Sequence, residues 1–236
     1  MTVAVIIAGG SGVRMHQDIP KQFLNVNNKP IIIYALEAFQ QHPNVDEICV
    51  AVLKGWDQVL WAYARQFNIS KLKYVVPGGV TGQESIFNGL SAVRKDHKDD
   101  DIIIVHDGNR PMVSQDILTD CLVKQRQYGS AVASIPCTEV VFVSEDNTCS
   151  NVSIPRETLQ RTQTPHAYTL GALWGAHMEA KEKGITNMAA SCALMAALGK
   201  TTYFSKGSEK NLKITTVEDI EIFKALLNAK NDTWLK

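Results

Sequence analysis

Short runs of apolar residues alternate with longer amphipathic stretches along most of the chain. The continuous apolar runs at 3–7, 47–53, 72–76, 102–105 and 131–135 predict strands that are buried on both faces. Between them, apolar positions recur at helical spacing and predict helices at 31–40, 56–66, 84–93 and 115–127. Parallel neighbours in a sheet need crossover connections, and the crossover helices cover the two faces of the sheet. The pattern therefore predicts an α/β fold with a doubly wound, mostly parallel sheet, whose ligands bind at the carboxyl ends of the strands.

The alternation stops between residues 138 and 163. This segment opens with a strand-like run at 140–143, passes through the turn residues Glu145-Asp146-Asn147, and continues as extended chain. We interpret it as a β-hairpin arm that projects from the sheet, and such an arm usually needs a partner to cover its apolar face. The sequence therefore predicts a homodimer formed through the arm.

Further elements are expected after the arm. Helical patterns cover 170–183 and 188–198, a strand is expected at 201–204, and a closing helix begins after Thr216. Because there is no internal repeat and no low-complexity linker, we expect residues 1–236 to form a single domain.

The amino-acid composition limits the classes of binding partner that the protein is expected to have. The 236 residues include 24 Lys and Arg against 24 Asp and Glu, so the net charge is zero and gives no basis for nucleic-acid binding through an excess of cations. The first apolar run is too short for a signal sequence, and no other run approaches a membrane span. The five cysteines contain no C-x-x-C pair, so we expect reduced thiols, and neither a zinc site nor a disulfide framework. These features predict a cytoplasmic protein without a membrane partner.

A glycine-rich loop follows the first predicted strand. In Ala8-Gly9-Gly10-Ser11-Gly12-Val13-Arg14-Met15, three glycines allow backbone N–H groups to approach a phosphate or a base closely. The G-x-G-x-x-G pattern of dinucleotide-binding enzymes would need glycine in place of Met15, and the P-loop pattern has no match. An NAD-dependent enzyme is therefore the weaker alternative. A tight turn would by itself also explain these glycines.

Two cations, Arg14 and Lys21, lie close to this loop in the sequence. Attack on the α-phosphorus of a nucleoside triphosphate adds negative charge to the equatorial and leaving oxygens, and Arg and Lys side chains stabilise that charge. From spacing alone, solvated surface charges explain the two residues equally well.

Five groups of residues, in order along the chain, carry a resemblance to a known family. The glycine-rich loop with Pro20-Lys21-Gln22 is the first. The others are Gly78-Gly79 with Ser85-Ile86-x-Asn88-Gly89-Leu90, Val105-His106-Asp107 with Arg110-Pro111, Pro155-Arg156-x-x-Leu159 with Gln163-Thr164-Pro165, and Asn211-x-Lys213-Ile214-Thr215-Thr216-x-x-Asp219. Over nearly its whole length the chain resembles the cytidylyltransferases that load sugar-alcohol phosphates with CMP, which act on 2-C-methyl-D-erythritol 4-phosphate or ribitol 5-phosphate. The resemblance implies a Rossmann-like nucleotidyltransferase fold.

The resemblance also implies residue roles, with CTP and an alditol phosphate as substrates. Arg14, Lys21 and Lys213 would grip the triphosphate and stabilise the pentacoordinate phosphorus as catalytic residues. Cytosine and ribose would be held by Ala8, Gly9, Gly10, Ser11, Gly12, Gly79 and Ser85. The acceptor would be bound by Asp107, Arg110, Arg156 and Thr164. Asp107 would also hold Mg²⁺, and Arg156 would lie near an arm that reaches the other subunit's active site.

Such a reaction needs no protein nucleophile. An oxygen of the acceptor phosphate attacks the α-phosphorus in line and pyrophosphate leaves, so positioning and charge neutralisation supply most of the catalysis. The acceptor phosphate is already largely ionised near neutral pH. We therefore expect structural hydrogen bonds from His106 and His166 and no general base.

Departures from the methylerythritol pattern cluster around the acceptor motifs. They are Gly82, Glu139-Val140, Gly108-Asn109, His166 and Thr186-Asn187. The CTP loop keeps the pattern, so the acceptor is expected to differ, with ribitol 5-phosphate favoured. The alternatives are 2-C-methyl-D-erythritol 4-phosphate as acceptor and a non-catalytic protein that retains CTP binding.

Overall fold

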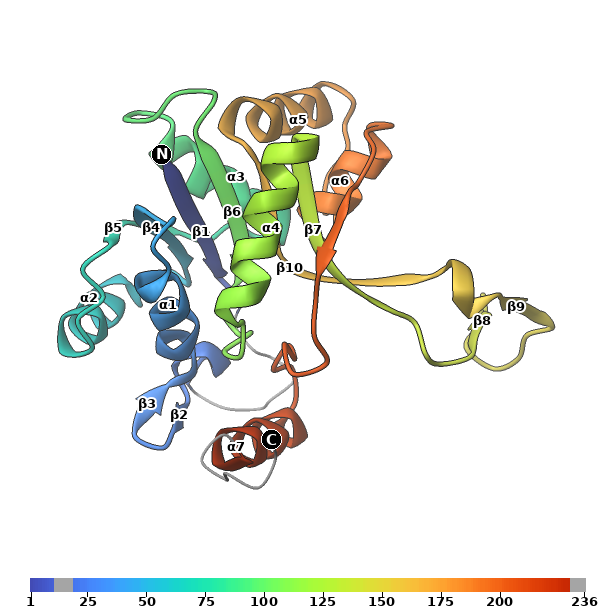
Figure 1. Cartoon of the computed structure of the whole chain (residues 1–236), viewed down its shortest axis with the longest axis horizontal. Coiled ribbons are helices and arrows are strands. Elements are labelled where there is room, and N and C mark those ends of the chain that lie inside the picture. Colours follow the sequence, from blue (N-terminus) through green and yellow to red (C-terminus); the bar gives the residue numbers. More distant parts are fainter. Residues whose placement is uncertain (11–18, 230–236) are drawn as a thin grey trace.

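A seven-stranded sheet forms the centre of the molecule in the computed structural model, which describes residues 1–10 and 19–229 (Figure 1). Its strand order is β11-β7-β10-β6-β1-β4-β5. The strands are β1 (Thr2–Ala8), β4 (Glu47–Val52), β5 (Leu72–Pro77), β6 (Ile102–Asp107), β7 (Ser130–Pro136), β10 (Gln160–Thr169) and β11 (Phe204–Lys206). Strand β10 is antiparallel to its neighbours β6 and β7, and the other pairs are parallel. The expected doubly wound, mostly parallel sheet is confirmed.

Helices cover both faces of this sheet because each strand presents apolar side chains alternately to the two sides. In β1, Ala4 and Ile6 belong to one core cluster, whereas Val3 and Val5 belong to another. The first cluster packs against α1 (Ile31–Gln41), α2 (Asp57–Gln66) and α4 (Gln115–Tyr128). The second packs against α3 (Gly82–Val93), α5 (Leu170–Glu182) and α6 (Ser191–Ala197).

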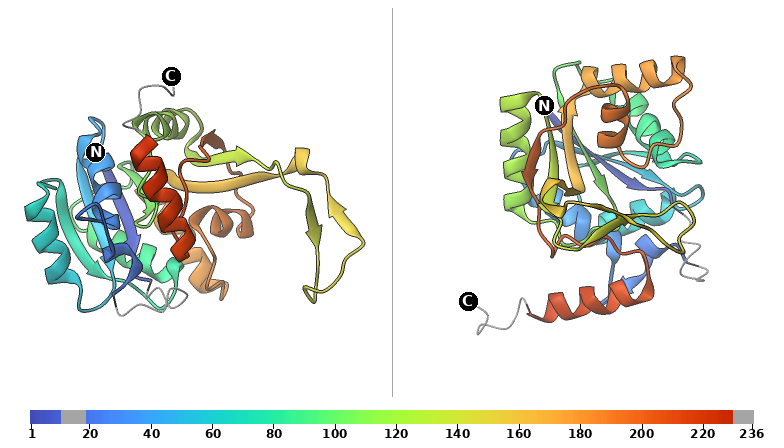
Figure 2. Two further views of the ribbon diagram at one scale, coloured as in Figure 1. Left: turned by 90° about the horizontal axis from the view of Figure 1, so that it is seen from below. Right: turned by 90° about the vertical axis from the view of Figure 1, so that its right-hand side faces the viewer.

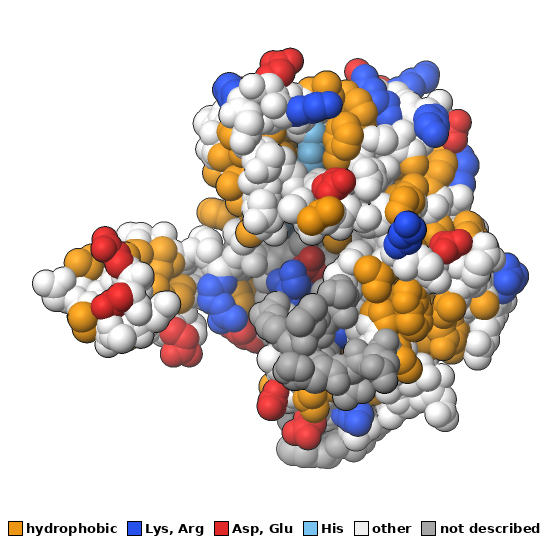
Figure 3. Space-filling view, turned by 180° about the vertical axis from the view of Figure 1, so that it is seen from behind, with side chains coloured by type: hydrophobic (Ala, Val, Ile, Leu, Met, Phe, Trp, Pro, Cys, Tyr) orange, Lys and Arg blue, Asp and Glu red, His pale blue; other side chains and the backbone are white. Residues whose placement is uncertain are grey.

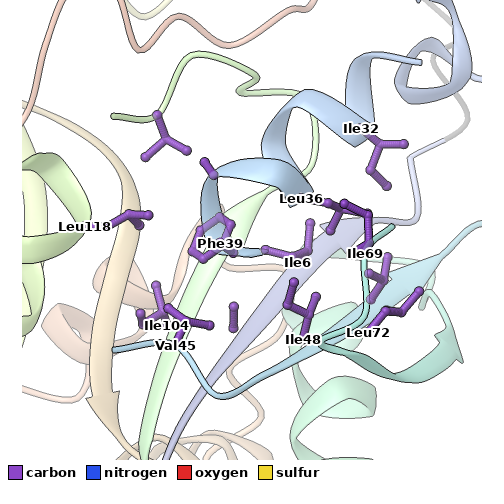
Figure 4. Close-up of a cluster of buried hydrophobic side chains, with 14 of the residues drawn as sticks. Ile6, Ile32, Leu36, Phe39, Val45, Ile48, Ile69, Leu72, Ile104 and Leu118 are labelled. Atoms are coloured by element: carbon purple, nitrogen blue, oxygen red, sulfur yellow. The ribbon is translucent and has the colours of Figure 1, made fainter. Parts of the chain in front are cut away.

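The first of these cores is centred on α1 (Figure 4). Leu36 and Phe39 of this helix lie against Ile6, Ile48 and Ile104 of three neighbouring strands, all fully buried. Burying side chains of this size contributes about 1.5–3 kcal/mol each before the entropy of ordering the chain is subtracted.

A third core lies beside the carboxyl ends of the strands. Helix α7 (Val217–Ala229) packs Phe223 against Ile31, Ile214 and the short hairpin of β2 (Asn25–Val26) and β3 (Lys29–Pro30). At its start Asp219 Oδ2 accepts hydrogen bonds from the backbone of Thr215 and Thr216. This capping arrangement explains why the helix begins at this point.

The arm leaves the sheet after β7 and returns at the start of β10 (Figures 1 and 2). It carries the antiparallel pair β8 (Val141–Val143) and β9 (Val152–Ile154), followed by the one-turn helix η3 (Arg156–Thr158). Val140, Phe142 and Val152 are more than half exposed on it. The arm is confirmed as a projecting hairpin with an uncovered apolar surface.

Two expectations about elements were wrong in detail. Residues 160–163 belong to the sheet strand β10 and not to the arm, because Gln160, Arg161 and Thr162 pair with β7. The strand expected at 201–204 begins only at Phe204, where pairing with Val132 of β7 starts. Within the described residues no helix is long and apolar enough to cross a membrane.

Candidate active site

The loops that follow β1, β5 and β6 converge at one edge of the sheet, as expected for parallel strands that end on the same side. A cavity of about 220 Å³ lies between them. We call it the first cavity, and its lining includes Ala8, Gly9, Gly10, Lys21, Gln22, Gly79, Thr81, Ser85, Asp107, Asn109 and Lys213.

Glycine is required where the loops after β1 and β5 touch. A Cβ atom on Gly78 would lie 2.7 Å from the Cα of Gly9, and one on Gly9 would lie 3.2 Å from the Ser85 Oγ. The loop after β1 is held further by Gln22, whose Nε2 donates to the carbonyl oxygens of Ala8 (2.7 Å) and Gly10 (3.1 Å). Two backbone segments can therefore approach a ligand at close range from two sides.

The amino-terminal end of α3 opens on the first cavity. Thr81 caps the helix by accepting a hydrogen bond from the Glu84 N–H at 3.1 Å, and the Ser85 Oγ accepts from the Gly79 N–H at 3.0 Å. The positive end of the helix dipole and the exposed N–H groups favour a ligand that is rich in negative charge.

A second cavity of about 210 Å³ adjoins the first. Its lining includes Ile7, Gly82, Asp107, Arg110, Thr162, Gln163, Thr164, His166, Ala189, Ser191 and Lys213. Asp107 and Lys213 line both cavities, together with Ile7, Gly82 and Ala189. Two small molecules held in the two cavities would thus meet at a shared wall with one carboxylate and one ammonium group.

Ion pairs organise this shared wall. Asp107 Oδ2 lies 3.1 Å from Lys213 Nζ and 3.1 Å from Arg110 Nε. Burial by itself would raise the pKa of Asp107, but the charges of Lys213 and Arg110 outweigh it and lower the pKa to about 2. Asp107 is therefore a carboxylate at every physiological pH.

The loop that carries Lys213 is fixed by buried hydrogen bonds. The Asn109 side chain donates from Nδ2 to the Ile214 backbone carbonyl at 2.5 Å. The backbone carbonyl of Asn109 accepts from the Ile214 N–H at 2.9 Å. The fully buried Asn211 side chain donates from Nδ2 to the Thr164 backbone carbonyl at 2.9 Å. The backbone carbonyl of Asn211 accepts from Arg110 Nη1 at 2.7 Å. The Lys213 backbone therefore lies between two anchored neighbours.

Asn109, Asn211 and Gln163 were not among the site residues expected from the sequence. Gln163 holds the same loop through two bonds to the Ser208 backbone, of 2.9 and 3.1 Å. The sequence did contain a signal for these residues. Gln163 and Asn211 lie within the motifs that carry the resemblance, and Asn109 is one of the departures from the methylerythritol pattern.

The structure brings most of the predicted site residues together. Eight of them, Ala8, Gly9, Gly10, Lys21, Gly79, Ser85, Asp107 and Lys213, line the first cavity, while Arg110 and Thr164 line the second. Ser11, Gly12 and Arg14 lie outside the described residues. Arg156 lines neither cavity; it is half exposed on η3 in the arm, where Nη1 donates to the Thr138 carbonyl at 3.0 Å.

The two histidines near the site form hydrogen bonds, as expected. His106 Nε2 lies 3.1 Å from the Arg110 carbonyl, and His166 Nδ1 lies 2.7 Å from the Ser191 Oγ. Burial lowers the pKa of each imidazole to about 4, so both rings are neutral near pH 7.

A protein-only metal centre is absent from residues 1–10 and 19–229, where no three His, Cys, Asp or Glu side chains are placed to hold an ion. A site built from one carboxylate and substrate phosphates remains compatible with this geometry, because Mg²⁺ usually keeps several water ligands. Asp107, at the wall of both cavities, is the carboxylate that fits it.

The chain matches the family model described as 2-C-methyl-D-erythritol 4-phosphate cytidylyltransferase over residues 2–229. It belongs to this cytidylyltransferase family. The resemblance carried by the five motifs is thereby confirmed, and the protein is a cytidylyltransferase, an enzyme that transfers CMP.

Individual relatives of this cytidylyltransferase carry two different names. The ribitol-5-phosphate cytidylyltransferase of Lacticaseibacillus paracasei is 44% identical over 98% of this chain and 99% of that protein. The 2-C-methyl-D-erythritol 4-phosphate cytidylyltransferase of Clostridium tetani is 33% identical over 97% of this chain and 92% of that protein. Among solved structures, the 2-C-methyl-D-erythritol 4-phosphate cytidylyltransferase of Francisella tularensis superposes with a TM-score of 0.80 at 27% identity, covering 95% of this chain and 99% of that one.

Proposed function

We propose that this cytidylyltransferase transfers CMP from CTP to ribitol 5-phosphate, giving CDP-ribitol and pyrophosphate. The observation that carries the choice of acceptor is the 44% identity to a ribitol-5-phosphate cytidylyltransferase over both full lengths, against 33% for the methylerythritol relative. The departures from the methylerythritol pattern support the same choice. Among them Gly82 and His166 line the second cavity.

In this proposal CTP occupies the first cavity. Backbone groups of Ala8 to Gly12 and Gly79, with the Ser85 side chain, hold the cytosine and ribose. The triphosphate lies toward Lys21, Lys213 and Arg14, which offset the charge that develops at the α-phosphorus. Support comes from the close approach of the loops at Gly9 and Gly78 and from the positive end of α3.

The acceptor occupies the second cavity with its phosphate at the shared wall. Arg110 and Lys213 draw the phosphate toward the α-phosphorus and Thr164 positions it for in-line attack, while the Asp107 carboxylate holds the two cations in place. Thr164 Oγ1 already accepts a hydrogen bond from the Asp107 N–H at 3.0 Å, so the two groups are held together. One phosphate oxygen forms the new P–O bond as the bond to pyrophosphate breaks, and no proton has to move to a protein base.

We propose Mg²⁺ as the cofactor, held by Asp107 and by triphosphate oxygens. When bound, the ion would neutralise charge on the phosphates.

We further propose that the active enzyme is a cytoplasmic homodimer joined through the arm. The uncovered Val140 and Phe142 support an arm interface, and Arg156 lies in the same arm without reaching either cavity of its own chain. Arg156 would then bind acceptor phosphate in the other subunit, where its guanidinium fits two oxygens at once. The cytoplasm is supported by CTP as substrate and by five cysteines that are all unpaired.

Pyrophosphate release with CTP and Mg²⁺ tests the acceptor directly. Ribitol 5-phosphate is compared with the phosphates of methylerythritol, arabinitol, glycerol and mannitol at equal concentration. We expect kcat/KM for ribitol 5-phosphate to exceed each of the others by about 100-fold, since an unpaired polar group in a site built for hydroxyls discriminates strongly. A higher value for methylerythritol 4-phosphate would contradict the proposed acceptor and restore the alternative.

A further inference from the structure

Two buried polar side chains, His166 in β10 and Ser191 at the start of α6, line the second cavity but not the first. Their exposed fractions are 1% and 2%. His166 Nδ1 and Ser191 Oγ are 2.7 Å apart, which is a short distance for a hydrogen bond between neutral groups. The ring is therefore in a position to fix the direction of the Ser191 hydroxyl.

The charges around the second cavity divide it into two regions. Asp107, Arg110 and Lys213 provide the ionic groups, and they suit the phosphate end of an acceptor. His166 is neutral near pH 7 because burial lowers its pKa to about 4. Together with Ser191 it therefore offers hydrogen bonds without charge, which suit a hydroxyl group and not a phosphate.

The Ser191 hydroxyl has hydrogen-bonding capacity beyond its contacts with His166 and the Tyr168 hydroxyl. A serine hydroxyl can donate once and accept twice, and these two contacts use two of the three. The remaining position of a buried hydroxyl that lines a cavity favours a ligand that pairs with it and disfavours a ligand that does not.

We propose that the Ser191 hydroxyl, positioned by His166, binds a hydroxyl on the carbon chain of the acceptor and so helps to determine which polyol phosphate is used. This inference rests on the proposed function in that it takes a polyol phosphate as acceptor. Ser191 would contact the substrate, whereas His166 would act through Ser191 as a positioning residue. The departure from the methylerythritol pattern at His166 agrees with a change in acceptor.

Steady-state kinetics of Ser191→Ala test the contact. With ribitol 5-phosphate we expect the acceptor KM to rise about tenfold, the size expected for one lost hydrogen bond, while the KM for CTP stays within about twofold. Ser191→Thr keeps a hydroxyl and should restore most of the acceptor affinity. Ser205→Ala is the matched control, because Ser205 is a buried serine of β11 that lines neither cavity.

Deoxy acceptors make the test specific to one hydroxyl group. Among ribitol 5-phosphates that lack a single hydroxyl, the wild type should lose about tenfold in kcat/KM on the analogue whose missing group faced Ser191. Ser191→Ala should treat that analogue and ribitol 5-phosphate alike. His166→Phe should raise the acceptor KM as Ser191→Ala does, and the double variant should add little, because both changes remove the same contact.

The outcomes separate this inference from the proposed function. An unchanged acceptor KM in Ser191→Ala, or an equal rise for CTP and acceptor, would overturn the inference alone. Should the wild type prefer another polyol phosphate, the ribitol assignment fails and the same variants with that acceptor decide the role of Ser191. Turnover of no polyol phosphate by the wild type would overturn both.

Discussion

At the scale of single residues, the shared wall between the two cavities is the most consequential feature. Two cations each lie 3.1 Å from the Asp107 carboxylate there, and the pKa of Asp107 is lowered to about 2 because the cations outweigh burial. The ion pairs hold Lys213 and Arg110 at the wall before any phosphate is bound. Preorganised charge of this kind stabilises a transition state without the cost of rearrangement.

Lys213→Ala should lower kcat by about 100-fold or more, because one positive charge is lost where negative charge develops. Circular dichroism should show an intact fold, since the Lys213 side chain is 42% exposed. Lys206→Ala is the control: Lys206 is also an exposed lysine, paired with Asp116 at 3.2 Å on the surface. Near-normal turnover in Lys213→Ala would remove this residue from the catalytic set.

At the scale of elements, β10 brings the site together. It is the antiparallel strand in a parallel sheet, and its pairing with β7 is interrupted between Thr162 and His166. Irregularities of this kind redirect side chains, and here Gln163 and Thr164 line the second cavity while they also bind the loop that carries Lys213.

Asn211→Ala tests the anchoring of that loop. Loss of this buried side chain leaves the Thr164 carbonyl without its partner at 2.9 Å, so we expect the free energy of unfolding to fall by about 1–3 kcal/mol. Turnover should fall as well, because Lys213 lies two residues away. Urea unfolding and kcat are measured together, with the exposed Asn228→Ala of α7 as the control. Unchanged stability would show that Asn211 does not hold the loop.

Phe142→Glu tests the arm as a dimer interface. Phe142 is 56% exposed in the single chain, and a charge placed in a dry interface costs several times what it costs on a free surface. We expect the dimer dissociation constant to rise at least about tenfold by analytical ultracentrifugation. The control is Val123→Glu, at a 51% exposed position on α4. A monomeric wild type, or equal effects of the two variants, would contradict an arm-mediated dimer.

Most of the strands and helices could be predicted from the sequence. Five sheet strands and the main helices came from apolar periodicity, because a strand buried on both faces must be apolar throughout. Strand β10 could not be found in this way: from Gln160 to Thr164 it is polar, because its first two residues are exposed and Thr162, Gln163 and Thr164 line the second cavity. Its polarity made it resemble a continuation of the arm.

At the scale of the whole molecule, packing buries four of the described histidines, and in three of them burial lowers the pKa far enough to leave the folded ring neutral near pH 7. Burial is the largest influence on His106, His166 and His177, and it lowers the pKa of each to about 4. An unfolded histidine has a pKa of about 6.5. Between these values the unfolded chain binds more protons than the folded one, so stability is full above about pH 6.5 and falls as the pH decreases toward 4.

We therefore expect the free energy of unfolding to decrease by about 1 kcal/mol per histidine for each pH unit in this window. Urea unfolding at several pH values between 4 and 7 measures the slope. His177→Gln should make the slope shallower, and because His177 lines neither cavity it separates this effect from the site. A stability that is independent of pH in this range would contradict the neutral, buried state of the three rings.

The sequence by itself determined the class of fold, the family and eight of the residues that line the first cavity. Strand and helix patterns are local, and a glycine-rich loop joined directly to a strand keeps its neighbours in the chain close in space. Only the tertiary structure decided which distant residues share a wall. Asp107, Thr164 and Lys213 meet because β10 pairs with β6 in the sheet and the loop before α7 is bonded to both, although the three segments are far apart in the chain. The pairing of His166 with Ser191 has the same origin, since the contact joins a central strand to a helix that packs on it.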